Sequence, residues 1–548
     1  MSLPDTSLWI VLVVAALGAP WLALALMLAA GPARPWLPAG AALPALACAL
    51  LVPDGVAITL SLGTVEVGFG IDAVNRVFLV AAALIWAVAG WHAALEQGSP
   101  AAQPRFAVPW LLALGGSLSL ILAQELLGFY TAMAVMSFAS WGLVVHDRSE
   151  GARSAGRLYL GMMMVGEVAM FTGIALLAAT SGSDPFAFDA VAQAPGPAMA
   201  LFGVGFAVKL GVLGVHAWLP RAHPAAPPAA SAVLSGVMIK AGLLGWWRIT
   251  EGVVGTLPTL GAFLVALGLV GAFYAVARGL VQNSAKTILA WSSVSQMGLI
   301  TLLAGTALMT PDAATAAWTA LAVFVLHHGL NKGALFLCAG LTSVGTTALR
   351  TLGWLLLWPP ALALAGAPLT AGALTKSAVE NAVYTIPGGT PIAALLYLSS
   401  LATTLLMLRL LWCARPRSWR VVPVALWRPL LPATLLVILG VALPWSWLAG
   451  SDAAAATLSG AGVWGATWPM GLAVAVALVV GYRGDLASAR LARLPRSAPW
   501  DSLETQGRRQ LVRLTTWERQ LQQWSTIGQA LLAVVLLIGT VTILEGLW

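Results

Sequence analysis

Long apolar stretches separated by short polar connections run through almost the whole chain. A helix needs about 20 consecutive apolar residues to cross the hydrocarbon core of a bilayer. By this criterion the pattern predicts about sixteen membrane-spanning helices, and therefore an all-α polytopic membrane protein. The predicted helices cover residues 7–30, 37–53, 71–95, 107–123, 126–146, 155–180, 197–217, 229–250, 257–279, 286–308, 313–342, 352–386, 391–414, 429–449, 463–482 and 525–547.

One of these segments, 352–386, is too long for a single crossing. It contains Pro359, Pro360, Pro368 and Gly372, which interrupt or bend a helix. We therefore expect a broken helix here.

Basic residues are distributed asymmetrically among the connections. Arginines gather in the connections that follow odd-numbered predicted helices, whereas those after even-numbered helices hold only Arg248, together with acidic residues. Because cytoplasmic loops are enriched in Lys and Arg, the pattern predicts that both termini are non-cytoplasmic. We expect a multi-pass protein of the bacterial inner membrane, with the first apolar run retained as a span.

A different pattern precedes the last predicted span. From about residue 500 to 524, Leu and Trp recur at helical spacing among Arg, Glu and Gln. This pattern predicts an amphipathic helix on the cytoplasmic interface within a segment 483–524, anchored by a helix at 525–548. An ordinary solvated linker helix is the alternative.

Composition agrees with a membrane protein, since 59% of the residues are hydrophobic and only 9% are charged. A soluble protein carries about 25% charged residues. The net charge of +8 belongs to the arginine-rich loops and does not indicate nucleic-acid binding. The three cysteines, Cys48, Cys338 and Cys413, lie in apolar stretches without the spacing of metal ligands. No metal site, cofactor site or catalytic set of residues is predicted.

The lysines are placed differently from the arginines. Of only five lysines, four lie inside predicted spans, namely Lys209, Lys240, Lys332 and Lys376. Arginine does not lose its proton in proteins, whereas burial favours the neutral form of lysine. An ionisable residue inside a membrane is costly and usually functional, although snorkelling or a structural ion pair is the alternative for each.

Acidic residues and histidines accompany these lysines. Those in or near spans are Asp72, Glu125, Glu167, Glu380, His216, His223, His327 and His328. His216 and His223 lie near Pro220 and Pro224, where we expect a helix to end or break. Exposed carbonyls are tolerated at membrane depth only inside protein or a hydrated cavity. Together these features predict a hydrated proton path.

Four motifs then occur in one order. They are VKLGVLGVHAWLPRAHPAAPPAASAVLSGVMIKAGLLGWWR from Val208, AKTILAWSSVSQMGLI from Ala285, HHGLNKGALFLCAG from His327 and AGAPLTAGALTKSA from Ala365. In this order they resemble the motifs of the proton-translocating antiporter-like subunits, the family that contains the pump subunits of respiratory complex I. The resemblance extends over about residues 70 to 415.

The resemblance implies two inverted five-helix repeats, each with a broken helix and a central lysine. The motif positions imply Lys209 in the first repeat and Lys376 in the second, Lys240 and His328 between them, Lys332 in an H-x-x-x-K pair, and Glu167 as the acid of a V-G-D/E motif. The remaining members of the predicted proton path are His216 and Glu380. The implied regions are N-terminal helices 1–106, repeats 107–250 and 257–414, C-terminal helices 429–482, the amphipathic segment 483–524 and the anchor helix 525–548.

The sequence departs from the family pattern at three positions. Ala134 stands where the family has a glutamate in helix five, Arg221 replaces the acid of L-P-D-A, and Gln296 replaces the histidine of S-H-M-G. Glu125 lies about two and a half turns before Ala134 and would substitute only partly. Glu167 is the better candidate partner for Lys209.

The family serves several kinds of complex. The missing helix-five glutamate and the short amphipathic helix favour the membrane subunit of a DAB-type inorganic-carbon system, which works with a large zinc-containing carbonic-anhydrase-like partner. The alternatives are a redox-driven pump (complex I or a membrane hydrogenase), a multi-subunit Na+/H+ antiporter, and a structural anchor with a degenerate pump. Protons are favoured over Na+, because lysine and histidine exchange protons whereas Na+ requires oxygen ligands.

Overall fold

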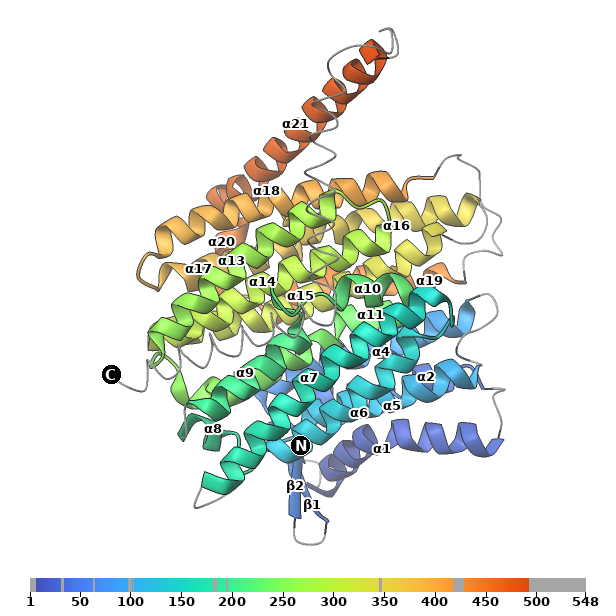
Figure 1. Ribbon diagram of the computed structural model, residues 1–548, viewed down its shortest axis with the longest axis vertical. Helices are drawn as coiled ribbons and strands as arrows, with labels where there is room; N and C mark the ends of the chain where they lie inside the picture. The colour runs from blue at the N-terminus through green and yellow to red at the C-terminus, as the bar shows by residue number, and fades with distance from the viewer. Residues whose placement is uncertain are drawn as a thin grey trace.

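The computed structural model is a bundle of long helices that lie roughly side by side across the width of Figure 1. It describes residues 6–30, 34–62, 65–96, 101, 103–180, 185–193, 196–343, 347–416 and 428–491. Thirteen helices in these ranges are long and apolar enough to cross a membrane, and two shorter apolar helical stretches cover Leu37–Leu51 and Pro197–Leu210. The predicted all-α membrane fold is confirmed. The count of sixteen stays a prediction, because 525–547 lies outside the described residues.

The first elements form the N-terminal region. They are α1 (Thr6–Ala30), α2 (Leu37–Gly40), α3 (Leu43–Leu51), β1 (Ala57–Leu62), β2 (Val65–Gly70) and α4 (Ala73–Leu95). The predicted single helix 37–53 is two helices, because Pro44 has no backbone N–H to continue the ladder from Gly40. The antiparallel hairpin β1–β2, registered from Ala57 opposite Gly70 to Leu62 opposite Val65, was not predicted.

Two sets of helices follow, each equivalent to five crossings. The first contains α5 (Pro104–Leu122), α6 (Leu126–Val144), α7 (Glu150–Thr180), α8 (Asp189–Gln193), α9 (Pro197–Leu210), α10 (Leu219–Ala225), α11 (Pro228–Gly236), η2 (Met238–Lys240), α12 (Ala241–Thr250) and η3 (Glu251–Val253). The second contains α13 (Pro258–Leu280), α14 (Ala285–Met309), α15 (Pro311–Ser343), α16 (Thr347–Ala365), α17 (Ala371–Tyr384) and α18 (Gly389–Ala414).

The two sets pair their helices in the same order. Helix α5 packs on α6 and α7 on α9, just as α13 packs on α14 and α15 on α16. Because five crossings separate the start of α5 from the start of α13, the second set runs in the opposite sense through the membrane. Small residues allow α13 and α14 to approach closely, since a Cβ on Gly298 would lie 2.6 Å from the carbonyl oxygen of Gly268.

Within the two five-crossing sets, three of the described crossings are interrupted. The broken helix predicted within 352–386 is present, with the break between Ala365 and Ala371; Pro359 and Pro360 lie inside α16. The predicted continuous helix 197–217 is wrong, because α9 ends at Gly211, whose φ of +72° is left-handed. That break therefore lies upstream of Pro220 and Pro224, which belong to α10. The predicted helix 229–250 is also interrupted, by the 3₁₀ turn η2.

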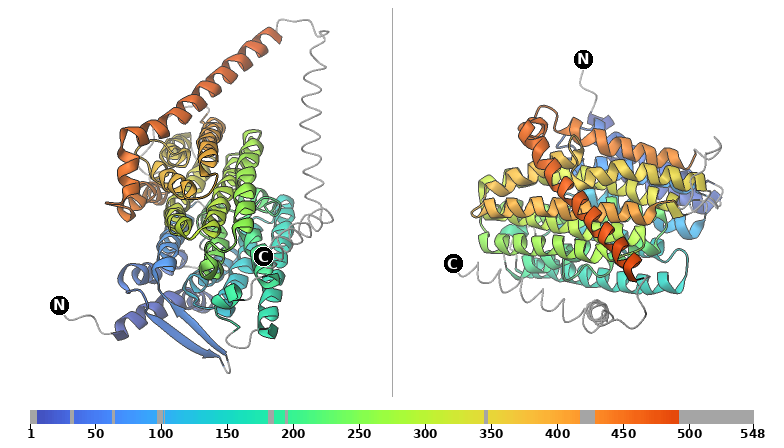
Figure 2. Two further views of the ribbon diagram at one scale, coloured as in Figure 1. Left: turned by 90° about the vertical axis from the view of Figure 1, so that its left-hand side faces the viewer. Right: turned by 90° about the horizontal axis from the view of Figure 1, so that it is seen from above.

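The last described helices are α19 (Leu430–Trp447), α20 (Asp452–Leu458) and α21 (Gly460–Leu491), and α21 runs obliquely over the others (Figure 2). Helix α21 extends beyond the predicted 463–482 and includes the start of the predicted segment 483–524. The rest of that segment, and the anchor helix 525–548, lie outside the described residues.

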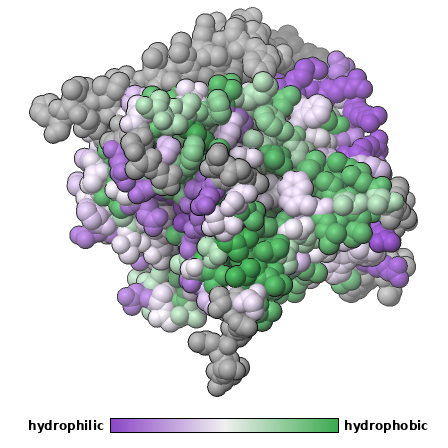
Figure 3. Space-filling model, turned by 90° about the horizontal axis from the view of Figure 1, so that it is seen from below, coloured by the Kyte–Doolittle hydropathy of each residue, from purple (hydrophilic) through white to green (hydrophobic). Residues whose placement is uncertain are grey.

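The outer surface suits a lipid environment. Figure 3 shows a broad hydrophobic area on the face seen from below, with hydrophilic groups gathered toward its margins. Helix α1 contributes exposed apolar side chains such as Leu22 and Leu28. Exposed apolar side chains of this kind are unfavourable in water but suit contact with the acyl chains of a bilayer.

Asp72 joins the hairpin, α4 and α12. Its carboxylate accepts hydrogen bonds from the backbone N–H groups of Val74 and Asn75 and caps α4, and its second oxygen lies 2.5 Å from Arg248 Nη2. Arg248 is the one arginine assigned to the connections after even-numbered predicted helices, and it forms an ion pair with Asp72.

We predict that Asp72→Ala lowers the stability of the protein more than Asp72→Asn does. The alanine removes a helix cap worth about 0.5–2 kcal/mol as well as the ion pair, whereas asparagine keeps the cap. Thermal unfolding in detergent measures both, with Asp54→Asn in the more exposed Arg76 pair as the control. Equal effects of the two Asp72 variants would contradict the capping role.

Candidate functional site

The first membrane lysine, Lys209, lies at the end of α9 beside α6 and α7. Its ammonium donates to the hydroxyl of Ser137 and lies 3.5 Å from the Glu167 carboxylate, and Ser137 Oγ is 2.6 Å from the same carboxylate oxygen. Lys209 and Glu167 are both buried. The expected partnership of Lys209 with Glu167 is therefore present, and a serine that was not predicted bridges the two groups.

The break after α9 is stabilised by the tryptophan of the H-x-W-L-P motif. Because the helix stops at Gly211, carbonyls of its last turn lose their partners in the backbone ladder. The indole N–H of Trp218 donates to the carbonyl oxygen of Val208 over 2.9 Å. The same carbonyl also accepts from the Gly211 N–H, so Trp218 adds a second hydrogen bond to it next to Lys209.

Lys240 lies at the interruption between α11 and α12. Its ammonium donates to the carbonyl oxygens of Ser235 and Gly236, each over 2.8 Å, where the chain leaves α geometry at Val237. In the part of the chain that the structure describes, no carboxylate pairs with it. A cationic group at a helix C-terminus meets the negative end of the helix dipole, which offsets part of the cost of burial.

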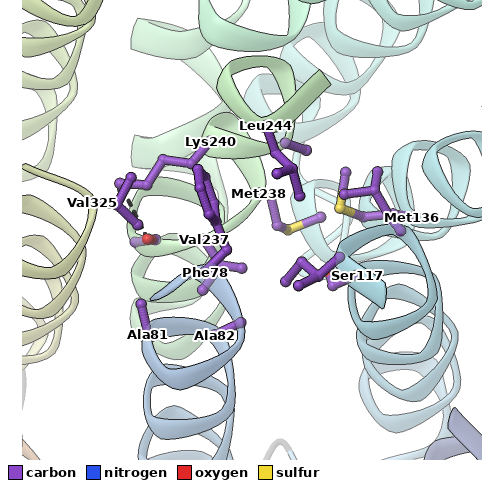
Figure 4. A pocket seen from close by; sticks show the side chains of 14 residues that line it. Phe78, Ala81, Ala82, Ser117, Met136, Val237, Met238, Lys240, Leu244 and Val325 are labelled. Atoms are coloured by element: carbon purple, nitrogen blue, oxygen red, sulfur yellow. Dashed lines mark hydrogen bonds between the residues drawn. The ribbon is translucent and has the colours of Figure 1, made fainter. Parts of the chain in front are cut away.

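A small cavity of about 10 Å³ lies next to Lys240, between α4, α5, α6 and α12. In Figure 4 the lysine side chain extends along one wall toward Val325, while Ser117 and Met136 lie on the opposite side. Most of the lining is apolar, and the volume suffices for about one water molecule.

Helix α15 carries Lys332 and both central histidines. The Lys332 ammonium donates to the Leu289 carbonyl over 2.7 Å and to the hydroxyl of Ser292, both on α14. Both ring nitrogens of the buried His328 are without a hydrogen-bond partner among the described residues, whereas His327 Nδ1 lies 3.2 Å from Asn331 Nδ2. Among the described residues, neither Lys332 nor the two histidines form an ion pair with a carboxylate.

The second broken helix holds Lys376 and Glu380 one turn apart on α17. The Lys376 ammonium donates to the carbonyl oxygen of Ala365, at the end of α16, and to the hydroxyl of Ser400 on α18. Glu380 accepts a 3.1 Å hydrogen bond from the Tyr397 hydroxyl. Lys376 and Glu380 thus have separate hydrogen-bond partners, whereas Lys209 and Glu167 form an ion pair.

Two cavities meet at this pair. One, of about 30 Å³, is lined by His327, Gln296, Lys376 and Glu380, and the other, of about 70 Å³, by Lys376, Glu380, Tyr397 and residues of α20 and α21. A space of about 10–15 Å³ holds one water molecule. Both cavities contain polar groups and are large enough for water on each side of Lys376.

The remaining candidates lie elsewhere. His216 is in the break after α9, with its ring 5.6 Å from those of Tyr274 and Trp291, and makes none of the lysine contacts. The Glu125 carboxylate accepts from the backbone N–H groups of Leu127 and Gly128 and caps α6. His223 stacks on Phe336.

Four partners in these contacts were not predicted: Ser137, Ser292, Ser400 and Tyr397. A serine in a membrane helix usually bonds to its own backbone one turn earlier, as Ser137 also does with Met133. The S-S pairs at 292–293 and 399–400 and the S-x-x-S at 137–140 were the available signal, but alone they do not distinguish a lysine partner from a packing residue.

Comparison with known proteins identifies the family. The profile described as "NADH:quinone oxidoreductase/Mrp antiporter, TM" matches residues 123–402, just over half of the chain. The chain belongs to this family. The matched range contains every lysine of this antiporter-like subunit, together with Glu167 and His328.

Individual relatives agree with this family. Hydrogenase-4 component B of Escherichia coli (strain K12) is 34% identical over 239 residues, which cover 41% of this chain and 36% of that protein. A chain of the Mrp complex from Dietzia sp. DQ12-45-1b has a TM-score of 0.75 at 20% identity, covering 98% of this chain and 63% of that one. A chain of respiratory complex I from Thermus thermophilus has a TM-score of 0.66 at 23% identity, covering 84% and 99%.

The structural and the sequence similarities support different conclusions. The two structures share the fold of the antiporter-like subunit. The matched region spans less than half the length of the first curated relatives, 36% in one and 48% in another. Family membership agrees with the prediction of a transport subunit and not an enzyme.

We predict that Glu167→Gln destabilises the protein by about 3–5 kcal/mol, because it leaves the buried Lys209 ammonium without its counter-charge. The double variant Glu167→Gln/Lys209→Met should recover most of this loss. Unfolding in detergent of the wild type, both single variants and the double variant completes the cycle. Additive effects of the two substitutions would contradict a direct pair.

Proposed function

We propose that this chain is a proton-translocating membrane subunit of a multi-subunit complex. The observation that carries the proposal is a set of four lysines inside the bundle, each hydrogen-bonded to a carbonyl or hydroxyl oxygen. Lys209, Lys240 and Lys332 are buried, and Lys376 is half-buried. Burying an ammonium is costly, and a protein that keeps four of them inside its spans has a use for their charge.

The chemistry of the partners suits reversible protonation. A serine hydroxyl accepts a hydrogen bond from an ammonium and, after rotating, donates one to a neutral amine. Ser137, Ser292 and Ser400 each contact a membrane lysine. Each of these lysines therefore keeps a partner in both protonation states.

The proposed path has three parts. Lys209, Ser137 and Glu167 form the first, and Lys240, Lys332 and His328 lie in the middle. Lys376 and Glu380 form the third part, where cavities of about 30 and 70 Å³ provide room for water on both sides. His216, in the break after α9, is a candidate for the entrance. Protons are the proposed ion, because most titratable groups of the path are lysines and histidines, which exchange protons, whereas Na+ requires a cluster of oxygens.

The proposed setting is the bacterial inner membrane, with both termini on the non-cytoplasmic side and other protein subunits as partners. The charge asymmetry of the loops supports the orientation. Support for a complex comes from the relatives, which are named as parts of a hydrogenase, an Mrp complex and complex I.

One observation favours a second candidate, the DAB-type inorganic-carbon subunit. Ala134 lacks the helix-five acid, and in this chain the acid that pairs with Lys209 stands on α7. A subunit without that helix-five acid is suited to work with one dissimilar partner, such as a zinc-containing carbonic-anhydrase-like protein. The assignment rests on the sequence, whereas the named relatives belong to redox or antiporter complexes.

We predict that Lys209→Met and Lys376→Met each reduce proton translocation by the whole complex at least tenfold in proteoliposomes, because a thioether cannot carry a proton. Lys286→Met is the matched control, since this lysine stands at the start of α14 and bonds to the Ala226 carbonyl. The control should keep most of the activity. Full translocation by an assembled complex with either path variant would favour the structural-anchor alternative.

Metal analysis of the gently purified complex separates the possible settings. A redox-driven complex should contain iron and several partner chains, whereas the inorganic-carbon assignment requires zinc, one large partner and no iron. Mass spectrometry identifies the partners in the same sample. If the complex contains neither iron nor zinc and only cation-antiporter subunits, the redox-driven and inorganic-carbon assignments are both wrong, and the Mrp-type setting remains.

A further inference from the structure

A wide groove opens where α5 begins, α6 ends and α7 begins. It has a volume of about 600 Å³ and is lined chiefly by Arg105, Trp141, His146, Arg148, Arg153 and Arg157. None of these groups belongs to the lysine path. Two of the arginines, Arg153 and Arg157, stand one turn apart on α7 and so face the same side.

The groove has an excess of positive charge. Its four arginines are exposed, and the ion pairs of the described chain involve other residues. The acids next in sequence, Asp147 and Glu150, do not line it, and the Asp147 carboxylate accepts from Ser149. Four guanidinium groups around one space repel each other unless an anion lies among them.

The connection between α6 and α7 holds the arginines in place. Arg148 has a φ of +59°, which costs about 1 kcal/mol or more for a residue with a side chain. Its N–H donates to the Val145 carbonyl, and the Ser149 hydroxyl accepts from the Ala152 N–H and caps α7.

His146 adds a neutral polar group. Burial, followed by the positive charge of Arg105, lowers the pKa of His146 from its usual value, so the imidazole is uncharged at neutral pH. Its buried Nδ1 has no hydrogen-bond partner among the described residues. The charge of the groove thus comes from the guanidinium groups.

An apolar surface continues from the groove along the membrane-spanning part of α7. Helical periodicity places Arg153, Arg157, Met164, Val168 and Phe171 on one side of this helix. The last three are 51%, 61% and 57% exposed, and Phe138 and Trp141 of the neighbouring α6 are also exposed. From Arg157 to Phe171 the stripe extends about 20 Å, comparable to an acyl chain. Tryptophan at the polar end is typical of the membrane interface.

We propose that this groove binds the phosphate headgroup of an anionic phospholipid, whose acyl chains lie against the exposed apolar stripe of α6 and α7. Charge complementarity selects the anionic headgroup, and the continuity of the arginines with a lipid-facing surface selects a lipid over a soluble anion. Arginine suits the site because its fork of N–H groups binds phosphate oxygens in pairs.

The test is lipid binding to the whole purified complex. After delipidation, phosphatidylglycerol or phosphatidylcholine is added, and the lipid retained by this chain is measured by native mass spectrometry. Variant Arg153→Gln/Arg157→Gln removes half of the guanidinium groups. Variant Arg34→Gln/Arg350→Gln is the matched control, because these exposed arginines lie outside the groove.

Retention of phosphatidylglycerol should fall at least tenfold in the groove variant, stay at the wild-type level in the control, and exceed that of phosphatidylcholine in the wild type. In the wild type alone, the preference should disappear at high salt, so the proposal remains testable if the variant does not assemble. Equal retention by variant and control would overturn it. So would displacement of the lipid by inorganic phosphate alone, or a cross-link placing residues 492–548 or another subunit in the groove.

Discussion

The need to satisfy a buried ammonium group is the constraint on which the rest of this structure depends. At membrane depth no bulk water replaces a missing hydrogen bond, and helices use their own carbonyls in the backbone ladder. At two of the four lysines the acceptors are carbonyls at a helix break. Lys240 uses the carbonyls released at the η2 interruption, and Lys376 uses that of Ala365 at the end of α16. The helix breaks are therefore part of the lysine sites.

The two sets of five crossings have the same arrangement of helices, but the lysine sites that they hold differ. In the first set a carboxylate on α7 pairs with Lys209 through Ser137, whereas in the second the corresponding helix, α15, carries Lys332 bonded to Ser292. An ion pair thus stands at this place in the first set, whereas Lys332 in the second has no carboxylate in an ion pair with it among the described residues. Proton movement through such an array changes the charge balance in the middle of the membrane, where electrostatic interactions are strong.

The spans, the lysines and the break within 352–386 could be predicted because each leaves a local signal: apolar length, a rare residue type, and proline. The break at Gly211 was implied only by the resemblance, through the broken helix that carries Lys209, and the interruption at Met238–Lys240 was not predicted. A glycine or a 3₁₀ turn inside an apolar run has no hydropathy signature. The hairpin β1–β2 was missed although Ile58, Leu60 and Leu62 alternate with polar residues. Ser137 and Ser400 were missed because their partners are distant in sequence and depend on packing. The pairing of Glu167 with Lys209 was predictable only from the motif order.

The most direct test of the central claim is proton flux through the whole complex in proteoliposomes with Lys209→Arg or Lys376→Arg. Arginine keeps the positive charge and the ability to donate to Ser137 or Ser400, but it does not release its proton. If the lysines carry protons, flux falls to the level of the leak although the complex assembles and its thermal stability is retained. Flux close to the wild-type rate in either variant would show that the charge alone matters at that position, and would contradict the account.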